Sequence, residues 1–314
     1  MYSYENYSKV KEKIEKRRTD ARAEADYRSI TLREESPEIA QIDATLSKTG
    51  LLLFKTACSG GDVSEIRERN AALTKKRREI LLSLGYPEDY TDVKYFCEKC
   101  SDTGFAENGK MCSCFREELI KATIASSGIG RLIEKQSFEN FSLDAITDEA
   151  ERKKTEKALK HCIAFAKNFA KDRGNLLLIG KTGTGKTHIS TAIAREVISA
   201  GFDVVYDSAQ NIFTNIENEK FRSGYDLQES QSSKYYECDL LIMDDLGTEF
   251  KTSFTLSCLY NIVNTRQNRG LSTIISTNLS PAELASSYED RIYSRIVGAE
   301  YTVLRFSGND MRIS

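Results

Sequence analysis

The sequence contains only three prolines, Pro37, Pro87 and Pro281, among 314 residues. Proline breaks a helix from within because it lacks a backbone N–H, so this scarcity favours long uninterrupted helices. The sequence also lacks any hydrophobic run near the ~18 residues of a membrane span, and its first residues lack the apolar segment of a signal peptide. We therefore expect a soluble, cytoplasmic protein with no membrane partner.

Neither sign of charge dominates the chain. The 45 Lys and Arg residues nearly balance the 47 Asp and Glu residues, which leaves a net charge of -2. This balance excludes a uniformly basic, histone-like nucleic-acid binder, although it is compatible with a local basic strip. Hydrophobic residues make up 40% of the chain, which is enough for a folded core and excludes general disorder.

Four of the eight cysteines are clustered as Cys97-x2-Cys100 and Cys112-x-Cys114. In a cytoplasmic protein, paired cysteines at such spacing more often bind a metal than form disulfides. The chain has only two histidines, and neither is near the cluster in sequence. We therefore predict a structural zinc site with four thiolate ligands; the alternative is four neighbouring free thiols. The other four cysteines are interpreted as small buried hydrophobic residues: Cys58, Cys162, Cys238 and Cys258.

Three regions of the chain differ in pattern. Residues 1–94 show amphipathic helical spacing, with Pro37 at the start of a second helix, which predicts a helical partner-binding domain. Residues 95–136 hold the cysteine cluster and a linker helix. In residues 137–314, helices alternate with short apolar segments, which predicts a doubly wound α/β domain with a five-stranded parallel sheet. The predicted strands are 175–179, 202–206, 239–243, 272–276 and 301–306.

The third region contains a P-loop, Gly180-Lys181-Thr182-Gly183-Thr184-Gly185-Lys186-Thr187. An apolar strand precedes it and a helical pattern follows it, which is the context that the motif requires. Its glycines allow backbone N–H groups to surround phosphate at the N-terminus of a helix. Lys186 is then placed to reach the β- and γ-phosphates, and the Thr187 hydroxyl to bind Mg²⁺. The motif predicts ATP and Mg²⁺ as ligands, and we assign His188, the next residue, to the same nucleotide-binding set.

A second polar element follows the apolar segment 240–243, which ends in Asp244 and Asp245. Burying charge is costly, so packing alone does not explain two carboxylates at the end of a buried strand. At the carboxyl edge of the sheet, Asp244 can complete the Mg²⁺ site and Asp245 can orient and deprotonate the attacking water. Asn278, at the end of the next strand, can position that water. The alternative is a strand that simply ends in a polar turn.

Together these residues resemble AAA+ ATPases of the bacterial replicative-helicase loader type (DnaC/DnaI). The resemblance covers residues 95–314 and rests on the P-loop, on Leu-Leu-Ile-Met-Asp-Asp-Leu-Gly-Thr-Glu at 240–249, on Ser-Thr-Asn at 276–278 and on Gly-Asn-Asp-Met-Arg at 308–312. It implies ATP hydrolysis on a five-stranded P-loop domain, here without a helical lid.

The resemblance also implies roles for single residues. Asn278 would be the sensor-1 residue, Arg295 an arginine finger directed at a neighbouring subunit, and Arg312 a sensor-2-like contact to the nucleotide. Arg291 precedes Arg295 by one helical turn on the same face, so it is an alternative finger.

The resemblance further implies a replicative helicase bound through the N-terminal domain, a nucleotide-dependent homo-oligomer and single-stranded DNA as partners. Residues 211–236 are a candidate DNA contact, because interleaved aromatic and basic side chains can stack bases and neutralise phosphates. A helix that packs its aromatic residues inward is an equally open alternative. The side chains concerned are Phe213, Lys220, Phe221, Arg222, Tyr225, Lys234, Tyr235 and Tyr236.

Helicase loading by an ATPase is therefore the leading functional hypothesis. One alternative is an IstB-like transposition helper ATPase, which shares the core but generally lacks the cysteine cluster. Another is a zinc-stabilised adaptor that uses the P-loop only as a nucleotide switch. The second carboxylate, Asp245, argues against the adaptor, because a pure switch does not need it.

Overall fold

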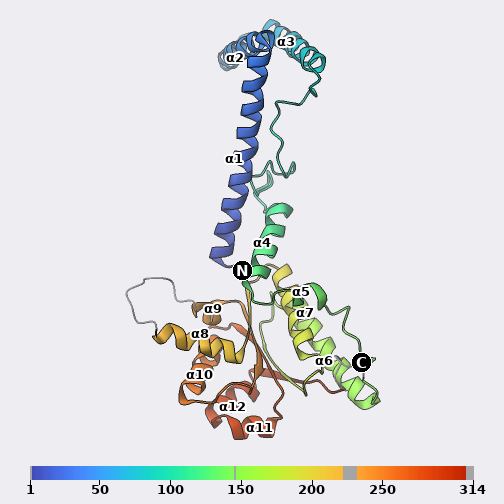
Figure 1. The fold of residues 1–314 in the computed structure, drawn as a ribbon, viewed down its shortest axis with the longest axis vertical. Coiled ribbons are helices and arrows are strands. Elements are labelled where there is room, and N and C mark those ends of the chain that lie inside the picture. Colours follow the sequence, from blue (N-terminus) through green and yellow to red (C-terminus); the bar gives the residue numbers. More distant parts are fainter. Residues whose placement is uncertain (1, 145, 222–231, 309–314) are drawn as a thin grey trace. The chain divides into compact units, whose positions relative to one another are not determined.

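The computed structural model describes residues 2–144, 146–221 and 232–308. The chain forms two compact units (Figure 1). One unit is Lys11–Phe115, and the other is Arg116–Ser314 together with Met1–Val10. These units are defined by their compactness and not by their function, so the functional domain boundaries at residues 94 and 136 stay a prediction. Throughout the part of the chain that the structure describes, every helix is too short or too polar to cross a membrane.

The unit Lys11–Phe115 is helical, as the amphipathic spacing predicts. It contains most of α1 (Tyr4–Glu35), α2 (Pro37–Cys58) and α3 (Ser64–Ser83). The Ser36 hydroxyl accepts a hydrogen bond from the backbone N–H of Ile39, and Pro37 occupies the first turn of α2, so the helix starts where the proline predicts. Leu32, Ile39 and Leu81 form a small buried cluster that joins the three helices.

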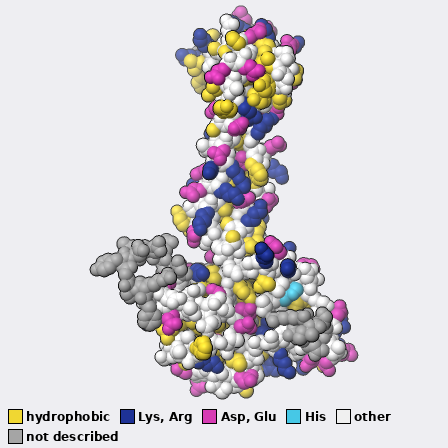
Figure 2. Space-filling view, in the orientation of Figure 1, with side chains coloured by type: hydrophobic (Ala, Val, Ile, Leu, Met, Phe, Trp, Pro, Cys, Tyr) yellow, Lys and Arg dark blue, Asp and Glu magenta, His cyan; other side chains and the backbone are white. Residues whose placement is uncertain are grey.

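Hydrophobic side chains also lie at the surface of this unit, over α2 and α3 (Figure 2). Leu51, Leu52 and Phe54 on α2 and Leu82 on α3 are each more than half exposed. We name the three residues that lie close together on α2, Leu51, Leu52 and Phe54, the apolar patch. Cys58, in the last turn of α2, is exposed, so its predicted burial was wrong. The other three isolated cysteines are buried, as predicted.

The larger unit is an α/β domain. Its strands are β1 (Asn175–Ile179), β2 (Val204–Ser208), β3 (Leu240–Leu246), β4 (Ser272–Thr277) and β5 (Tyr301–Arg305). They pair in parallel in the order β2-β3-β4-β1-β5, which confirms the predicted five-stranded parallel sheet. Its helices are α4 (Ser113–Ser126, which begins in the other unit), α5 (Leu132–Lys135), α6 (Glu149–Asn168), α7 (Lys186–Ser199), α8 (Ala209–Phe221), α9 (Ser233–Glu237), α10 (Ser253–Asn268), α11 (Pro281–Ser287) and α12 (Asp290–Val297).

Helices cover both faces of the sheet. Successive side chains of a strand point to opposite faces, so each strand contributes to two hydrophobic cores. Leu176 and Leu178 of β1 pack with α5, α6 and α7, whereas Leu177 and Ile179 pack with the face covered by α8 to α12. The strand order places β4 between β1 and β3. Since all strands are parallel, the residues that follow β1, β3 and β4 meet at one edge, and this edge carries the P-loop and the polar residues predicted above.

Candidate nucleotide site and four-cysteine cluster

The P-loop connects β1 to α7 through glycines that the backbone requires. Gly185 precedes α7 with φ of 89°, in the left-handed region. A Cβ atom at Gly180 would lie 2.4 Å from the backbone oxygen of Phe306, so only glycine fits there. Buried residues of α7, Ile189 and Ile193 among them, hold the helix against the sheet. The backbone N–H groups at the start of α7 therefore face the carboxyl edge of the sheet.

Lys186 is buried, and its ammonium group is held by three oxygens. Its Nζ donates to the backbone oxygens of Gly180 at 2.7 Å and Lys181 at 3.0 Å, and to Oδ1 of Asn278 at 2.7 Å. The lysine thus contacts both the P-loop and the end of β4. A phosphate at this loop would meet a cation that is already oriented by its neighbours.

Asp244, a buried residue near the C-terminal end of β3, is surrounded by hydroxyl groups. Thr187 donates to its Oδ2 at 3.1 Å, Tyr206 donates to the same oxygen, and Ser276 donates to Oδ1. Burial raises the pKa of Tyr206, and the nearby Asp244 carboxylate raises it further, so the tyrosine keeps its proton and acts as donor.

Thr187 and Asp244 fit a magnesium site. Mg²⁺ bonds to oxygen at about 2.0–2.1 Å with octahedral geometry, so neighbouring ligand oxygens are about 3 Å apart. The 3.1 Å between Thr187 Oγ1 and Asp244 Oδ2 matches this spacing. These two residues would hold the ion, which would supply positive charge to the phosphates.

Asp245 follows in an unusual backbone conformation, with φ of 54°. The pairing of β3 with β4 shifts between Met243 and Leu246, and the Asp245 N–H donates to Ser276 Oγ at 3.0 Å. A left-handed residue at the end of a strand is a strained feature that is typical of functional sites. With this backbone conformation Asp245 faces the cavity beside the P-loop, and Asp245 and Asn278 both line that cavity.

That cavity has a volume of about 460 Å³, in the range of small-molecule sites. The P-loop residues Thr182, Gly183, Gly185, Lys186 and Thr187 line it, and so does His188. His188 Nε2 is 2.8 Å from the backbone oxygen of Ser137, and its ring contacts Phe141 edge-on. The lining also includes Leu132 and Gln136, which the sequence analysis missed because α5 has no recognisable motif.

The two arginines that the resemblance makes candidate arginine fingers lie on α12, away from the cavity lining. Arg291 and Arg295 both sit on α12 over the Tyr260 ring, at 5.1 and 5.3 Å from its centroid, which confirms that they share one face. Arg291 pairs with Glu289 at 2.7 Å, and Arg295 donates to Gln267 Oε1 at 3.2 Å. Neither arginine lines the cavity of its own chain. Arg312 lies outside the described residues.

The candidate DNA segment is partly excluded from that role. Phe213 and Tyr235 are 2% and 0% exposed and belong to the core with α8 and α9, so for these two rings the alternative of inward packing is confirmed and base stacking is excluded. Packing of these rings against the sheet decides their position. Lys220 and Lys234 are exposed. The Phe221 side chain, Arg222 and Tyr225 lie outside the described residues.

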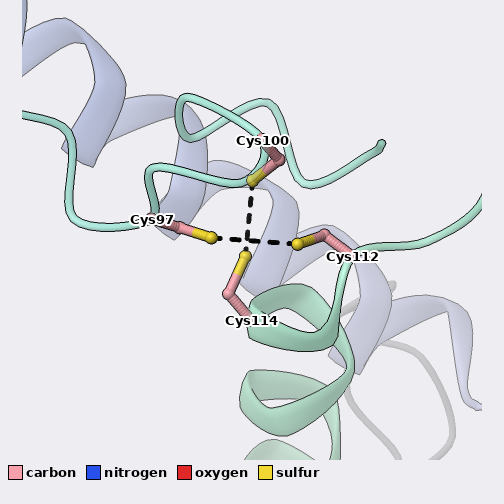
Figure 3. Close-up of side chains that lie close together, drawn as sticks. All are labelled: Cys97, Cys100, Cys112 and Cys114. Atoms are coloured by element: carbon pink, nitrogen blue, oxygen red, sulfur yellow. Dashed lines mark hydrogen bonds between the residues drawn. The ribbon is translucent and has the colours of Figure 1, made fainter. Parts of the chain in front are cut away.

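The four clustered cysteines converge on one point (Figure 3). Their sulfur atoms all lie within 4.8 Å of one another, with 3.8 Å between Cys97 and Cys112 and 3.5 Å between Cys100 and Cys114. Four thiolates around zinc at about 2.3 Å would be about 3.8 Å apart, so the arrangement fits a closed tetrahedral zinc site. A closed site of this kind suits a structural role.

The loops that carry the cysteines are held by their own hydrogen bonds. Asp102 is 2% exposed and accepts from the backbone N–H groups of Phe96 and Cys97, at 2.8 and 3.0 Å. Burial raises the pKa of Cys97 and of Cys114, whereas the backbone N–H of Cys114 lowers the pKa of Cys112 to about 7. The thiolate of Cys112 is therefore more populated at neutral pH than that of an ordinary cysteine.

Comparison with known proteins places the α/β domain in a family. The model of the family described as "IstB-like ATP binding protein" matches residues 127–310. The phage-like element PBSX protein XkdC of Bacillus subtilis (strain 168) is 25% identical over 229 residues, which are 66% of this chain and 80% of that protein. The replicative helicase loader DnaC of Escherichia coli (strain K12) is 25% identical over 177 residues, 56% of this chain and 69% of that protein. The chain is also similar to a crystal structure of the DnaC helicase loader. The match covers 55% of this chain and 98% of the loader chain, with 20% identity and a TM-score of 0.48. The family match includes the P-loop and both aspartates, and it begins after the last clustered cysteine.

Proposed function

Because this chain belongs to the family of IstB-like ATP-binding proteins, we propose that it binds ATP with Mg²⁺ and hydrolyses it. The observation that carries the proposal is the convergence of Lys186, Thr187, Asp244, Asp245 and Asn278 at one edge of the sheet, beside a single cavity. These residue types supply a phosphate-binding cation, two magnesium ligands, a carboxylate base and a polar amide, which are the parts that phosphoryl transfer to water needs.

In this proposal each residue has one task. The ammonium of Lys186 neutralises charge on the β- and γ-phosphates, and Thr187 and Asp244 hold Mg²⁺. Asp245 accepts a proton from the attacking water, while Asn278 orients that water and keeps Lys186 in place. Arg295 reaches the phosphates of a neighbouring subunit, which makes the active form a homo-oligomer. Asp245 is the residue that separates hydrolysis from mere nucleotide binding.

We further propose that the chain loads a replicative DNA helicase. Two observations support this function. A curated relative at 25% identity is a replicative helicase loader, and the helical unit displays the apolar patch, three exposed hydrophobic side chains close together on α2. The four cysteines would hold one structural zinc ion. Single-stranded DNA would be a second ligand.

The loading proposal is tested with the full chain and the replicative helicase from the same organism. We expect co-elution of the two proteins, with binding weakened tenfold or more by the double substitution Leu51→Ser, Phe54→Ser. The matched control is Phe250→Ser, which removes an 83% exposed phenylalanine from the other unit and should leave helicase binding unchanged. Equal binding by all three proteins would show that the apolar patch is not the contact.

The family description favours a second candidate, an IstB-like transposition helper. The same co-elution experiment with a transposase in place of the helicase separates the two. Binding to the transposase, with no binding to the helicase, would assign the chain to transposition and leave the proposed ATP hydrolysis intact.

A further inference from the structure

Tyr206 on β2 contacts two separate parts of the α/β unit, the end of β3 and the segment that follows α4. Its hydroxyl donates to Oδ2 of Asp244, the oxygen that also accepts from Thr187. Its backbone N–H donates to the backbone oxygen of Ser127 at 2.7 Å, just beyond the end of α4. One residue therefore links the proposed magnesium carboxylate to the segment that enters the domain.

The segment beyond α4 is packed tightly against Tyr206. Ser127 is 1% exposed, and its hydroxyl donates to the backbone oxygen of Ile124 at 2.8 Å. Gly128 has φ of 84°, and a Cβ atom there would lie 2.4 Å from the Tyr206 backbone oxygen. The backbone of Gly128 therefore lies so close to the backbone of Tyr206 that no side chain fits between them, and the hydrogen bond from Tyr206 N–H to Ser127 couples the two segments directly.

The first turn of α1 is attached to the same place. Asn6 is 3% exposed, and its Nδ2 donates to Ser126 Oγ at 2.8 Å and to Thr123 Oγ1 at 3.5 Å. These residues belong to the same compact unit as Tyr206. The beginning of α1, the end of α4, Tyr206 and Asp244 thus form one continuous set of hydrogen-bonded neighbours.

We propose that Tyr206 is a positioning residue that orients Asp244 for Mg²⁺, and that it transmits movements of the α1–α4 junction to this carboxylate. The inference rests on the proposed function, because it assigns Mg²⁺ to Asp244. Partners that orient a metal-binding carboxylate typically contribute 10- to 100-fold to metal affinity. Tyr206 also holds Oδ2 through a hydrogen bond, so a shift of its ring changes the direction in which that oxygen points.

The positioning role is tested by Tyr206→Phe in the full chain. Binding of a fluorescent ATP analogue and ATP hydrolysis are each measured as a function of free Mg²⁺. We expect the Mg²⁺ concentration for half-maximal binding to rise about tenfold, while analogue binding in excess EDTA stays unchanged. The matched control is Tyr235→Phe, which removes another tyrosine hydroxyl from the core, one that donates to Asp207 at 2.9 Å. An unchanged Mg²⁺ dependence in Tyr206→Phe, or the same shift in Tyr235→Phe, would overturn the assignment.

The transmitting role is tested with two glycines. Gly128→Ala should raise the Mg²⁺ requirement, because its methyl group displaces the Tyr206 backbone. Gly130→Ala is the control: Gly130 also has a left-handed φ, of 59°, but a Cβ atom there meets nothing within 4 Å. Both variants carry similar backbone strain, which thermal unfolding measures, and only Gly128→Ala should change the Mg²⁺ dependence.

A double-mutant cycle then decides whether the effect passes through the Tyr206 hydroxyl. Adding Gly128→Ala to Tyr206→Phe should produce no further shift in the Mg²⁺ requirement. Fully additive shifts would show that Gly128 acts by another route and would overturn the transmitting role. If the unmodified chain binds the analogue with Mg²⁺ but does not hydrolyse ATP, the proposed ATPase function fails, whereas the shift in Mg²⁺-dependent binding still tests Tyr206.

Discussion

Lys186 Nζ lies 2.7 Å from Oδ1 of Asn278, a residue 92 positions further along the chain. The bond joins the helix that follows β1 to the end of β4, and it forms because these strands are neighbours in the sheet. It sets the lysine at the point where the P-loop, the strand edge and the cavity meet. The first prediction follows from this position.

Lys186→Ala should lower ATP turnover by ~10²-fold or more, because the phosphates lose their oriented cation. Turnover is measured as phosphate release at saturating ATP. The control is Lys171→Ala, an exposed lysine after α6, which should keep the turnover of the unmodified chain. Undiminished hydrolysis by Lys186→Ala would contradict the assignment of the P-loop.

Asp245→Asn should retain ATP binding and lose turnover by ~10²–10⁴-fold, because an amide cannot accept the proton of the attacking water. The φ of 54° at this position favours the substitution, since asparagine adopts left-handed backbone more readily than most residues. Binding is measured with a fluorescent ATP analogue, alongside phosphate release. If nucleotide affinity fell as far as turnover, Asp245 would be a metal ligand or a structural residue.

The purified protein should contain one zinc ion per chain, measured by elemental analysis of freshly reduced protein. Cys100→Ser should release the metal and disorder the loops between residues 95 and 115, because a tetrahedral site loses a ligand. Cys58→Ser changes an exposed cysteine outside the cluster and should keep the metal. Zinc retained by Cys100→Ser would argue against the tetrahedral site.

Arg295→Ala should leave nucleotide affinity intact and lower turnover at concentrations where subunits associate, by as much as ~10³–10⁵-fold if the guanidinium is a full arginine finger. Mixing it with Lys186→Ala should restore part of the activity, since one subunit supplies the arginine and the other the pocket. Arg291→Ala, the neighbour on α12, is the comparison that separates the two arginines. Turnover per subunit that does not depend on concentration, with no rescue on mixing, would exclude action across an interface.

Stability should depend on pH through Asp203. Burial and the nearby Asp239 carboxylate raise the pKa of Asp203 to about 6. The folded state therefore binds more protons than the unfolded state between pH ~4 and ~6, so stability decreases as pH rises through this window.

Asp203→Asn removes the partly buried charge and should stabilise the protein at pH 8 by about 1–3 kcal/mol, with the difference disappearing near pH 4. Denaturant unfolding at the two pH values measures this. Asp172→Asn, at an exposed position, is the control. A gain in stability that is equal at both pH values would mean that the charge of Asp203 is not its cause.

The sequence by itself determined the elements whose chemistry is local. The P-loop needs only a strand, a glycine-rich turn and a helix in succession, and all three are contiguous in residues 175–199. The paired spacing of the cysteines likewise predicts their convergence, because short loops limit how far the sulfur atoms can separate. The apolar strand ending in Asp244 and Asp245 identified the polar edge of β3, since buried strands rarely end in two carboxylates without a reason.

Tertiary structure alone decided what depends on strand order and packing. No local pattern places β2 beside β3, yet this pairing brings Tyr206 to Asp244. Packing between helices far apart in sequence decides three further features: the burial of Tyr235, the contact of Arg295 with Gln267, and the place of Gln136 in the cavity lining. Side chains of the same type are exposed or buried according to their neighbours in space, and those neighbours are fixed only when the sheet and its covering helices assemble.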